Sequence, residues 1–266
     1  MEIHHCENPV CRFVTRHAVP DMCPLCGGAF FLPSDGSDLV AADWVALGIE
    51  SKTDGRFDDA FSDFEKAAAE GDAAGQCMLG LAYETGEGVA QSWPDAVLLY
   101  RAAAGQGHAQ AQCNLGWCYE FGKGVELDEA RAVELYRAAA EQGLPRAQCC
   151  LGYCTEKGIG TEADPAAAAE WYRRSAEGGY SRGMYNYACC FENGTGVKKD
   201  LPLAQQWYER AAKEGLPDAM YELGVWYEDG RCGPKDAAQA LAWYKKAAEA
   251  GHDRARKAVE RMEKLV

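Results

Sequence analysis

Apolar and polar positions recur along most of the chain with a fixed period, from about residue 71 to residue 251. Glycine occupies one slot of this period and tyrosine another, and successive members such as Gly71 and Gly107 are 36 residues apart. The glycines are Gly71, Gly107, Gly143, Gly179, Gly215 and Gly251, and the tyrosines are Tyr100, Tyr136, Tyr172, Tyr208 and Tyr244, with Phe64 in the same slot upstream. Self-similarity at this spacing is typical of solenoids and other tandem arrays.

Each period contains two stretches with the helical spacing of apolar residues, for example 109–119 and 128–141. A Gly-x-Gly loop separates the two stretches, and a further glycine follows the second one, as expected just beyond helix ends. Because one amphipathic helix pair cannot bury its apolar face alone, successive pairs must stack on one another. We therefore predict an all-α fold, an α/α superhelical solenoid that spans residues 42–266.

The period also sets the expected units of this solenoid. They are a degenerate first unit at residues 42–71, full units at 72–107, 108–143, 144–179, 180–215 and 216–251, and a capping helix at 252–266. Residues 34–41 are interpreted as a linker to a separate N-terminal module at residues 1–33.

Two further residue types recur on the first helix of each predicted pair. The glutamates Glu84, Glu120, Glu156, Glu192 and Glu228 are interpreted as helix caps or as hydrogen-bond acceptors for the loops. The cysteines fill two slots, Cys77, Cys113 and Cys149 in one and Cys118, Cys154 and Cys190 in the other. We interpret both slots as small buried side chains, the role in which an unreactive cysteine is usually found.

The N-terminal module carries its own cysteines, Cys6, Cys11, Cys23 and Cys26. Two thiolate pairs around a short β-prone stretch match the tetrahedral ligand set of a structural Zn²⁺ ion, and the second pair has the form of a zinc-ribbon knuckle. A module of this size cannot fold on an apolar core alone, so zinc would contribute on the order of 10 kcal/mol to its folding. The first pair is more widely spaced than usual, and this leaves His4, His5 and His17 as alternative ligands.

Charge and hydropathy narrow the possible partners. The formal net charge is -14, whereas nucleic-acid binding depends on clustered Lys and Arg, so nucleic acid is a poor candidate, and a zinc-ribbon nucleic-acid adaptor is kept only as an alternative. We find no apolar run long enough to span a bilayer and no signal-peptide pattern at the start. The sequence thus predicts a cytoplasmic protein that is a monomer and has no membrane partner.

The repeated motif Leu-Gly-x-x-Tyr-Glu-x-Gly-x-Gly-Val stands at residues 79–89, and again at 115–125 with Cys118 before its Tyr-Glu pair. Followed by a Tyr-x-x-Ala-Ala block, it resembles the Sel1-like repeat family, which is tetratricopeptide-like, over about four fifths of the chain. The resemblance implies a scaffold or adaptor that binds proteins or peptides without a cofactor and usually without catalysis. Some members of the family carry a β-lactamase label, so a hydrolase is the alternative from another class.

A search for catalytic patterns favours a protein that is not an enzyme. The segment from Gly179 to Gly183, with Ser181 at its centre, matches the Gly-x-Ser-x-Gly elbow of hydrolases. That motif requires a strand that leads into a helix, whereas here Gly179 is the regular repeat glycine and Ser181 opens the next helix. The Ser-x-x-Lys set of β-lactamases and the His-Glu-x-x-His motif are both missing from the sequence.

A binding surface is easier to predict, because the first helix of every unit should line the inner surface of the solenoid. Slots there that vary between units are candidates for ligand contact, and in the central units they hold aromatic and cationic residues. The predicted peptide-binding groove consists of Asn114, Trp117, Phe121, Arg146, Tyr153, Lys157, Arg182 and Asn186. Its basic centre favours an extended segment that carries a carboxylate, and the alternative is a solvated face with no ligand.

Overall fold

The structure, a computed structural model, describes residues 3–6, 14–16, 25, 39–231 and 233–264. Over these residues it contains thirteen helices and one pair of short strands. The strands are β1 (His4–His5) and β2 (Val14–Thr15), and the helices are α1 (Ala41–Thr53), α2 (Phe57–Ala69), α3 (Ala73–Thr85), α4 (Trp93–Gly105), α5 (Ala109–Phe121), α6 (Glu129–Glu141), α7 (Pro145–Lys157), α8 (Pro165–Glu177), α9 (Ser181–Asn193), α10 (Leu201–Lys213), α11 (Pro217–Asp229), α12 (Ala237–Glu249) and α13 (Asp253–Glu263). The predicted helical solenoid is confirmed.

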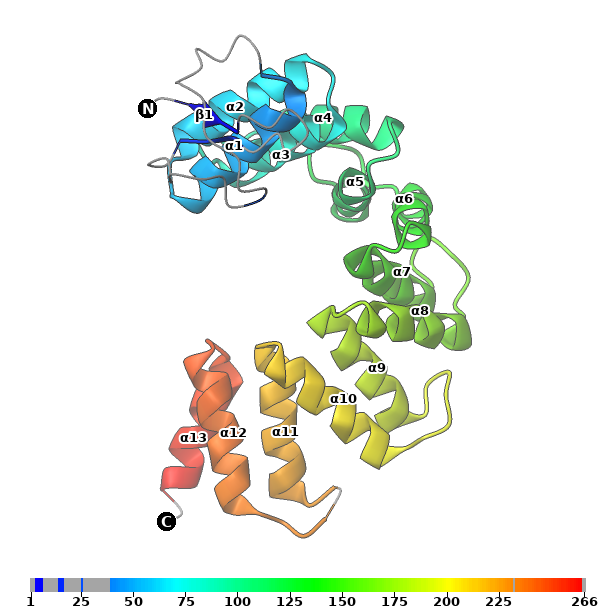
Figure 1. The fold of residues 1–266 in the computed structure, drawn as a ribbon. Coiled ribbons are helices and arrows are strands. Elements are labelled where there is room, and N and C mark those ends of the chain that lie inside the picture. The colour runs from blue at the N-terminus through cyan, green and yellow to red at the C-terminus, as the bar shows by residue number, and fades with distance from the viewer. Residues whose placement is uncertain (1–2, 7–13, 17–24, 26–38, 232, 265–266) are drawn as a thin grey trace. The chain divides into compact units, whose positions relative to one another are not determined.

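The chain divides into two compact units, residues 1–128 and 129–266. The first unit holds the two strands and α1 to α5, and the second holds α6 to α13. Within each unit, consecutive helices pack against one another in the order of the chain, as can be followed by colour in Figure 1. No helix that the structure describes is long and apolar enough to cross a membrane.

Helix ends follow from the residues at the caps. The second helices begin after a polar residue whose side chain accepts a backbone N–H, as Ser92, Asp164, Asp200 and Asp236 do. The first helices of the repeats end at a glycine with a left-handed backbone, as α7 does at Gly158 with φ 71°. The residues that begin and end the helices therefore recur every 36 residues, as the apolar residues do.

The core of each repeat is built around the tyrosine of its second helix. Tyr100, Tyr172, Tyr208 and Tyr244 are all at most 1% exposed. In three repeats the ring lies against a glycine of the first helix, where a Cβ would come within 2.8 Å of ring carbons at Gly80 and Gly152 and within 2.5 Å at Gly224. The ring and a first-helix side chain compete for the same space, which explains why this slot holds small residues.

The second glycine of each Gly-x-Gly loop packs against the preceding helix pair. A Cβ at Gly88 or Gly160 would overlap the backbone carbonyl of Phe57 or Glu129, at the start of the second helix of the pair before. Gly196 meets the carbonyl of Pro165 in the same way. At these three glycines the loop thus lies directly against backbone atoms of the preceding helix pair.

Candidate interaction surfaces

The recurrent glutamates accept hydrogen bonds from the recurrent tyrosines. The hydroxyl of Tyr100 donates to Glu84 Oε2 at 2.6 Å, and Tyr172 donates to Glu156 at 2.9 Å. Tyr208 and Tyr244 donate in the same way to Glu192 and Glu228, at 2.6 Å and 2.7 Å. Burial raises the pKa of each of these four tyrosines well above its ordinary value of 10.0. The glutamates are hydrogen-bond acceptors, as the sequence indicated, but their donor is a side chain of the second helix and not a loop.

The first helix pair departs from this pattern in two places at once. Phe64 stands in the tyrosine slot and has no hydroxyl to donate. Lys52 stands in the slot that holds glutamate in the other repeats, four residues after the small residue of the first helix. Its ammonium group forms an ion pair with Glu87 at 2.6 Å. The first helix pair thus lacks both the tyrosine hydroxyl and the glutamate carboxylate. Neither slot therefore holds half of the hydrogen bond without its partner.

Three predicted groove residues lie in the first unit, on α5. Trp117 stacks against Trp93 with ring centroids 5.5 Å apart and contacts Phe121 at 5.1 Å. The Phe121 side chain is 52% exposed, whereas Asn114 is only 5% exposed and accepts a hydrogen bond from Gln110. The aromatic pair therefore presents a surface, and Asn114 belongs to the interior of the helix pair.

The other five predicted groove residues lie in the second unit, on α7 and α9. Tyr153 is 43% exposed, and Arg182 is also exposed but pairs with Asp218 at 2.6 Å. The Lys157 ammonium pairs with the neighbouring Glu156, and this hydrogen bond raises the pKa of the lysine. Asn186 donates to the Sγ atom of the buried Cys149, and Arg146 is half-buried. The cationic patch is present, although Asp218 and Glu156 neutralise part of it.

The capping helix α13 continues this surface, which sequence analysis did not anticipate. By the 36-residue period, Arg254 falls in the slot of the groove residues Arg146 and Arg182. Arg261 falls in the slot of Trp117 and Tyr153. Together with Tyr221 of α11, Arg254, Lys257 and Arg261 line a shallow pocket of about 280 Å³. Extending the period past residue 251 would have identified these cations.

Acidic and aromatic side chains from α11 lie beside this basic helix. The Tyr221 ring stacks on His252 with centroids 4.5 Å apart, and His252 Nε2 lies 3.3 Å from Asp218. Glu222 is half-buried on the same helix, and burial raises its pKa. Arg261 pairs with Glu228 at 2.6 Å. The face formed by α7, α9, α11 and α13, here called the first-helix face, thus alternates in charge along the second unit.

The repeat cysteines are buried, as predicted. Cys77, Cys113, Cys118, Cys149, Cys154 and Cys190 are all at most 5% exposed. Burial raises the pKa of the Cys118, Cys149 and Cys190 thiols to about 12, and that of the Cys189 thiol to about 11. A thiol with so high a pKa is a poor nucleophile at neutral pH. Ser181 is the first residue of α9 and follows a helix and a turn, so it does not have the context of a nucleophile elbow.

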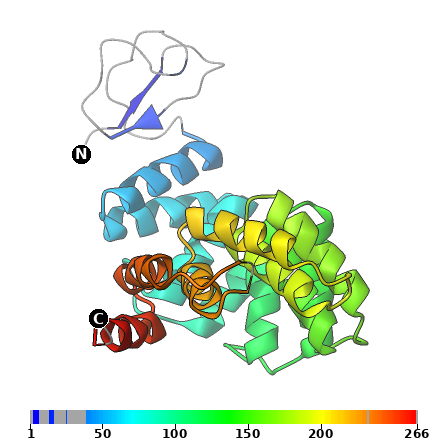
Figure 2. The ribbon, with the colours of Figure 1, turned by 90° about the horizontal axis from the view of Figure 1, so that it is seen from below.

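The described part of the N-terminal module packs on the first helix pair. Strands β1 and β2 are antiparallel, with His4 opposite Thr15, and β2 lies beside α1 (Figure 2). The guanidinium of Arg16 reaches the fully buried Asp63 of α2 with two hydrogen bonds, one of them 2.7 Å from Nη2 to Oδ1. No pattern in the sequence predicts this ion pair, because its partners are 47 residues apart and Arg16 lies outside the repeats.

The predicted zinc ligands fall almost entirely outside the described residues. Cys6 is buried beside the short strands, whereas Cys11, Cys23, Cys26 and His17 belong to stretches that the structure does not describe. No group of three or more His, Cys, Asp or Glu side chains that could hold a metal occurs within the described ranges. The zinc site therefore stays a prediction.

Comparison with known proteins agrees with the repeat geometry. The model of the Sel1 repeat matches residues 73–108, 109–144, 145–180, 181–216 and 217–252, each one residue later than the unit expected from the sequence. A search of curated proteins found no match.

Solved structures extend the similarity. A Sel1 repeat protein from Oxalobacter formigenes is 36% identical, with a TM-score of 0.73 over 81% of this chain and 86% of that one. The protective antigen c5321 of uropathogenic Escherichia coli is 32% identical, with a TM-score of 0.67 over 84% of this chain but only 48% of its own. The immunity protein Pa5087 from Pseudomonas aeruginosa, 17% identical with a TM-score of 0.55 over 84% of this chain and 89% of that one, shares the fold. With five matched repeats over most of its length, the chain belongs to the Sel1 repeat family.

Proposed function

We propose that this protein is a scaffold whose first-helix face binds an extended, acidic segment of a partner protein. The supporting observation is the set of cations on α13 and α9. Arg254 and Lys257 are exposed and line the pocket beside Tyr221. Neither forms an ion pair with a carboxylate of the described residues. In a chain with a net charge of -14, two such cations in a hollow favour an anionic ligand.

The neighbouring side chains give this surface the mixed character of a peptide site. The phenol ring of Tyr221 and the exposed ring of Tyr153 supply apolar area with a polar edge, which is common at interface anchors. Arg182 has its guanidinium on Asp218, an ion pair between exposed groups of the kind that contributes about 0 to 1 kcal/mol. An incoming carboxylate can therefore replace Asp218 as the partner of Arg182 at little cost.

The proposal is tested with a fluorescein-labelled peptide of about eight residues that alternates glutamate and leucine, long enough to extend across neighbouring repeats. Its binding is measured by fluorescence anisotropy at low and at high salt. We expect saturable binding that weakens as salt screens the charges. We also expect at least a roughly tenfold loss in the Arg254→Glu/Lys257→Glu variant, since like charges oppose each other across an interface.

The matched control is Arg256→Glu/Lys264→Glu, which makes the same charge change at two exposed positions of the same helical segment that are not among the pocket residues. It should bind the peptide as the unmodified chain does. Equal affinity in all three proteins, or equal binding of a lysine-leucine peptide, would show that this face is not the binding site.

A further inference from the structure

The pocket beside α13 is lined by three cations, and the described residues around it include no acidic side chain. The cations are Arg254, Lys257 and Arg261, and successive ones are three and four positions apart, a spacing that places side chains on one face of a helix. Tyr221 and the small Ala258 complete the lining. The positive charge of this pocket is opposite in sign to the net charge of the chain.

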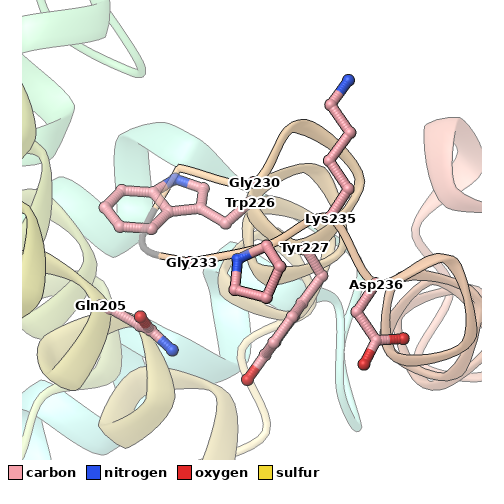
Figure 3. A pocket seen from close by; sticks show the side chains of 8 residues that line it. Gln205, Trp226, Tyr227, Gly230, Gly233, Lys235 and Asp236 are labelled. Atoms are coloured by element: carbon pink, nitrogen blue, oxygen red, sulfur yellow. The ribbon is translucent and has the colours of Figure 1, made fainter.

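A second pocket of the same unit, formed by α10, α11 and the loop that follows, has a different charge. Its volume is about 350 Å³, and Figure 3 shows one cation, Lys235, and one anion, Asp236, among the side chains that line it. The other lining residues are uncharged, among them Gln205 and Trp226. Of these two pockets, only the one beside α13 has a surplus of positive charge.

Two of the cations beside α13 together match a doubly charged anion. Arg254 and Lys257 form no ion pair with a carboxylate of the described residues, and the single charge of a glutamate side chain would leave one of them unmatched. A phosphate ester carries about -1.5 to -2 charges at neutral pH and presents three acceptor oxygens. Arginine binds phosphate through two parallel hydrogen bonds, and lysine binds it as a point charge. The two cations therefore match a phosphate group more closely than a carboxylate.

The third cation, Arg261, can contribute to such a site without leaving a carboxylate unpaired. Its Nη2 atom donates to both carboxylate oxygens of Glu228, at 2.7 Å and 2.6 Å, whereas its Nε and Nη1 atoms have no acceptor among the described residues. Glu228 Oε2 also accepts the hydroxyl of Tyr244 at 2.7 Å. Glu228 thus keeps a hydrogen-bond donor when Arg261 turns towards a ligand.

We propose that this pocket receives a phosphorylated side chain, phosphoserine or phosphothreonine, from the segment that the first-helix face binds. The inference rests on the function proposed above and adds the chemistry that the pocket prefers. The pocket is shallow, with a volume of about 280 Å³, and this suits a phosphate on a short side chain. Arg254 and Lys257 neutralise the phosphate, and Arg261 donates to a further oxygen. Phosphorylation of the partner therefore strengthens its binding to the scaffold.

The test uses the full-length chain and fluorescein-labelled peptides of about eight residues that alternate glutamate and leucine, as above. One central glutamate is kept, replaced by phosphoserine, or replaced by serine. Binding is measured by fluorescence anisotropy at a single salt concentration. We expect the phosphoserine peptide to bind about tenfold more tightly than the glutamate peptide, because of its additional charge and oxygens, and the serine peptide to bind most weakly.

Variants of the ion pair between Arg261 and Glu228 sharpen this test. Arg261→Gln should weaken binding of the phosphoserine peptide about tenfold and that of the glutamate peptide less than about threefold. Glu228→Gln frees Arg261, while its amide oxygen still accepts the Tyr244 hydroxyl, so it should strengthen binding of the phosphoserine peptide about threefold. The matched control is Arg256→Gln, which removes an exposed arginine of α13 that does not line the pocket. Equal losses in Arg261→Gln and Arg256→Gln would contradict the proposal, and circular dichroism checks that each variant keeps its helices.

The outcomes separate this inference from the proposed function. If the glutamate peptide binds and phosphoserine brings no gain, the phosphate assignment is wrong and the scaffold function stands. If no peptide binds, the proposed function fails and this inference fails with it. Inorganic phosphate should displace the phosphoserine peptide only at concentrations about a hundredfold or more above the Kd of the peptide, since it lacks the contacts of the flanking chain. Displacement near that Kd would assign the pocket to free phosphate and overturn the assignment to a partner protein.

Discussion

Tyr100→Phe should destabilise the first unit by removing a single hydrogen bond. The hydroxyl of Tyr100 is 2.6 Å from Glu84 Oε2, and the side chain is fully buried. A hydrogen bond to a charged acceptor contributes about 1.5–3 kcal/mol, and in a chain of this size each kcal/mol lowers Tm by about 2–4 °C. The expected fall in Tm is therefore roughly 3 to 12 °C. Phenylalanine fits the slot, as Phe64 shows in the first pair, so the ring packing is retained.

A double-mutant cycle with Glu84→Gln separates the hydrogen bond from other effects of the tyrosine. The amide oxygen of glutamine still accepts the hydroxyl, so Glu84→Gln alone should cost less than Tyr100→Phe. The two changes together should cost less than the sum of the single ones, because each removes part of the same interaction. The unfolding is followed by circular dichroism in urea and by hydrogen exchange of α3 and α4, since repeat arrays need not unfold in one step. Strictly additive losses, or a Tyr100→Phe loss below about 0.5 kcal/mol, would refute this reasoning.

Three further predictions concern a cap, a loop and the metal. Burial lowers the pKa of His108, whose Nδ1 caps α5, below its ordinary 6.5. The imidazole therefore binds a proton more readily in the unfolded chain than in the folded one. The contribution of this cap to the free energy of unfolding is complete above about pH 6.5 and is lost as the pH falls below that value. In the His108→Asn variant, the free energy of unfolding measured across this pH range should change less with pH. Gly196→Ala should lower the free energy of unfolding by about 2 kcal/mol or more, measured by urea titration, because φ is 71° and the Cβ would overlap the Pro165 carbonyl. Elemental analysis should find about one zinc per chain, and none in Cys23→Ser/Cys26→Ser, while the helical circular dichroism stays unchanged; a chain purified without zinc would contradict the ligand assignment.

The helix boundaries within each repeat could be predicted closely, because they depend on residues that are near each other in the sequence. The slots of Gly158 and Asp164 stop one helix and start the next, and both can be found in a single period. The tyrosine and glutamate slots were found as well, but not their hydrogen bond. Tyr172 and Glu156 are 16 residues apart on different helices, and only the packing of those helices brings them together.

Contacts between successive repeats, and between the N-terminal module and the first helix pair, were harder to predict from the sequence. Arg182 and Asp218 occupy the same slot of successive repeats, so their ion pair was available from the period once opposite charges in matching slots were compared. Arg16 and Asp63 offered no such sign, since an ion pair between the residue that follows a short strand and a helix depends on tertiary structure alone.

The seating of each loop on a backbone carbonyl has a consequence for how such arrays change in length. Gly160 rests on the carbonyl of Glu129, and Gly196 rests on that of Pro165, 31 residues earlier in both cases. Deletion of residues 145–180 would bring Gly196 to Glu129 at the same separation in sequence. Because the nearest atoms at both of these glycines belong to the backbone, this particular contact does not depend on which side chain the preceding helix carries there. Recombination that removes or duplicates one whole repeat would therefore preserve this contact between the loop and the backbone.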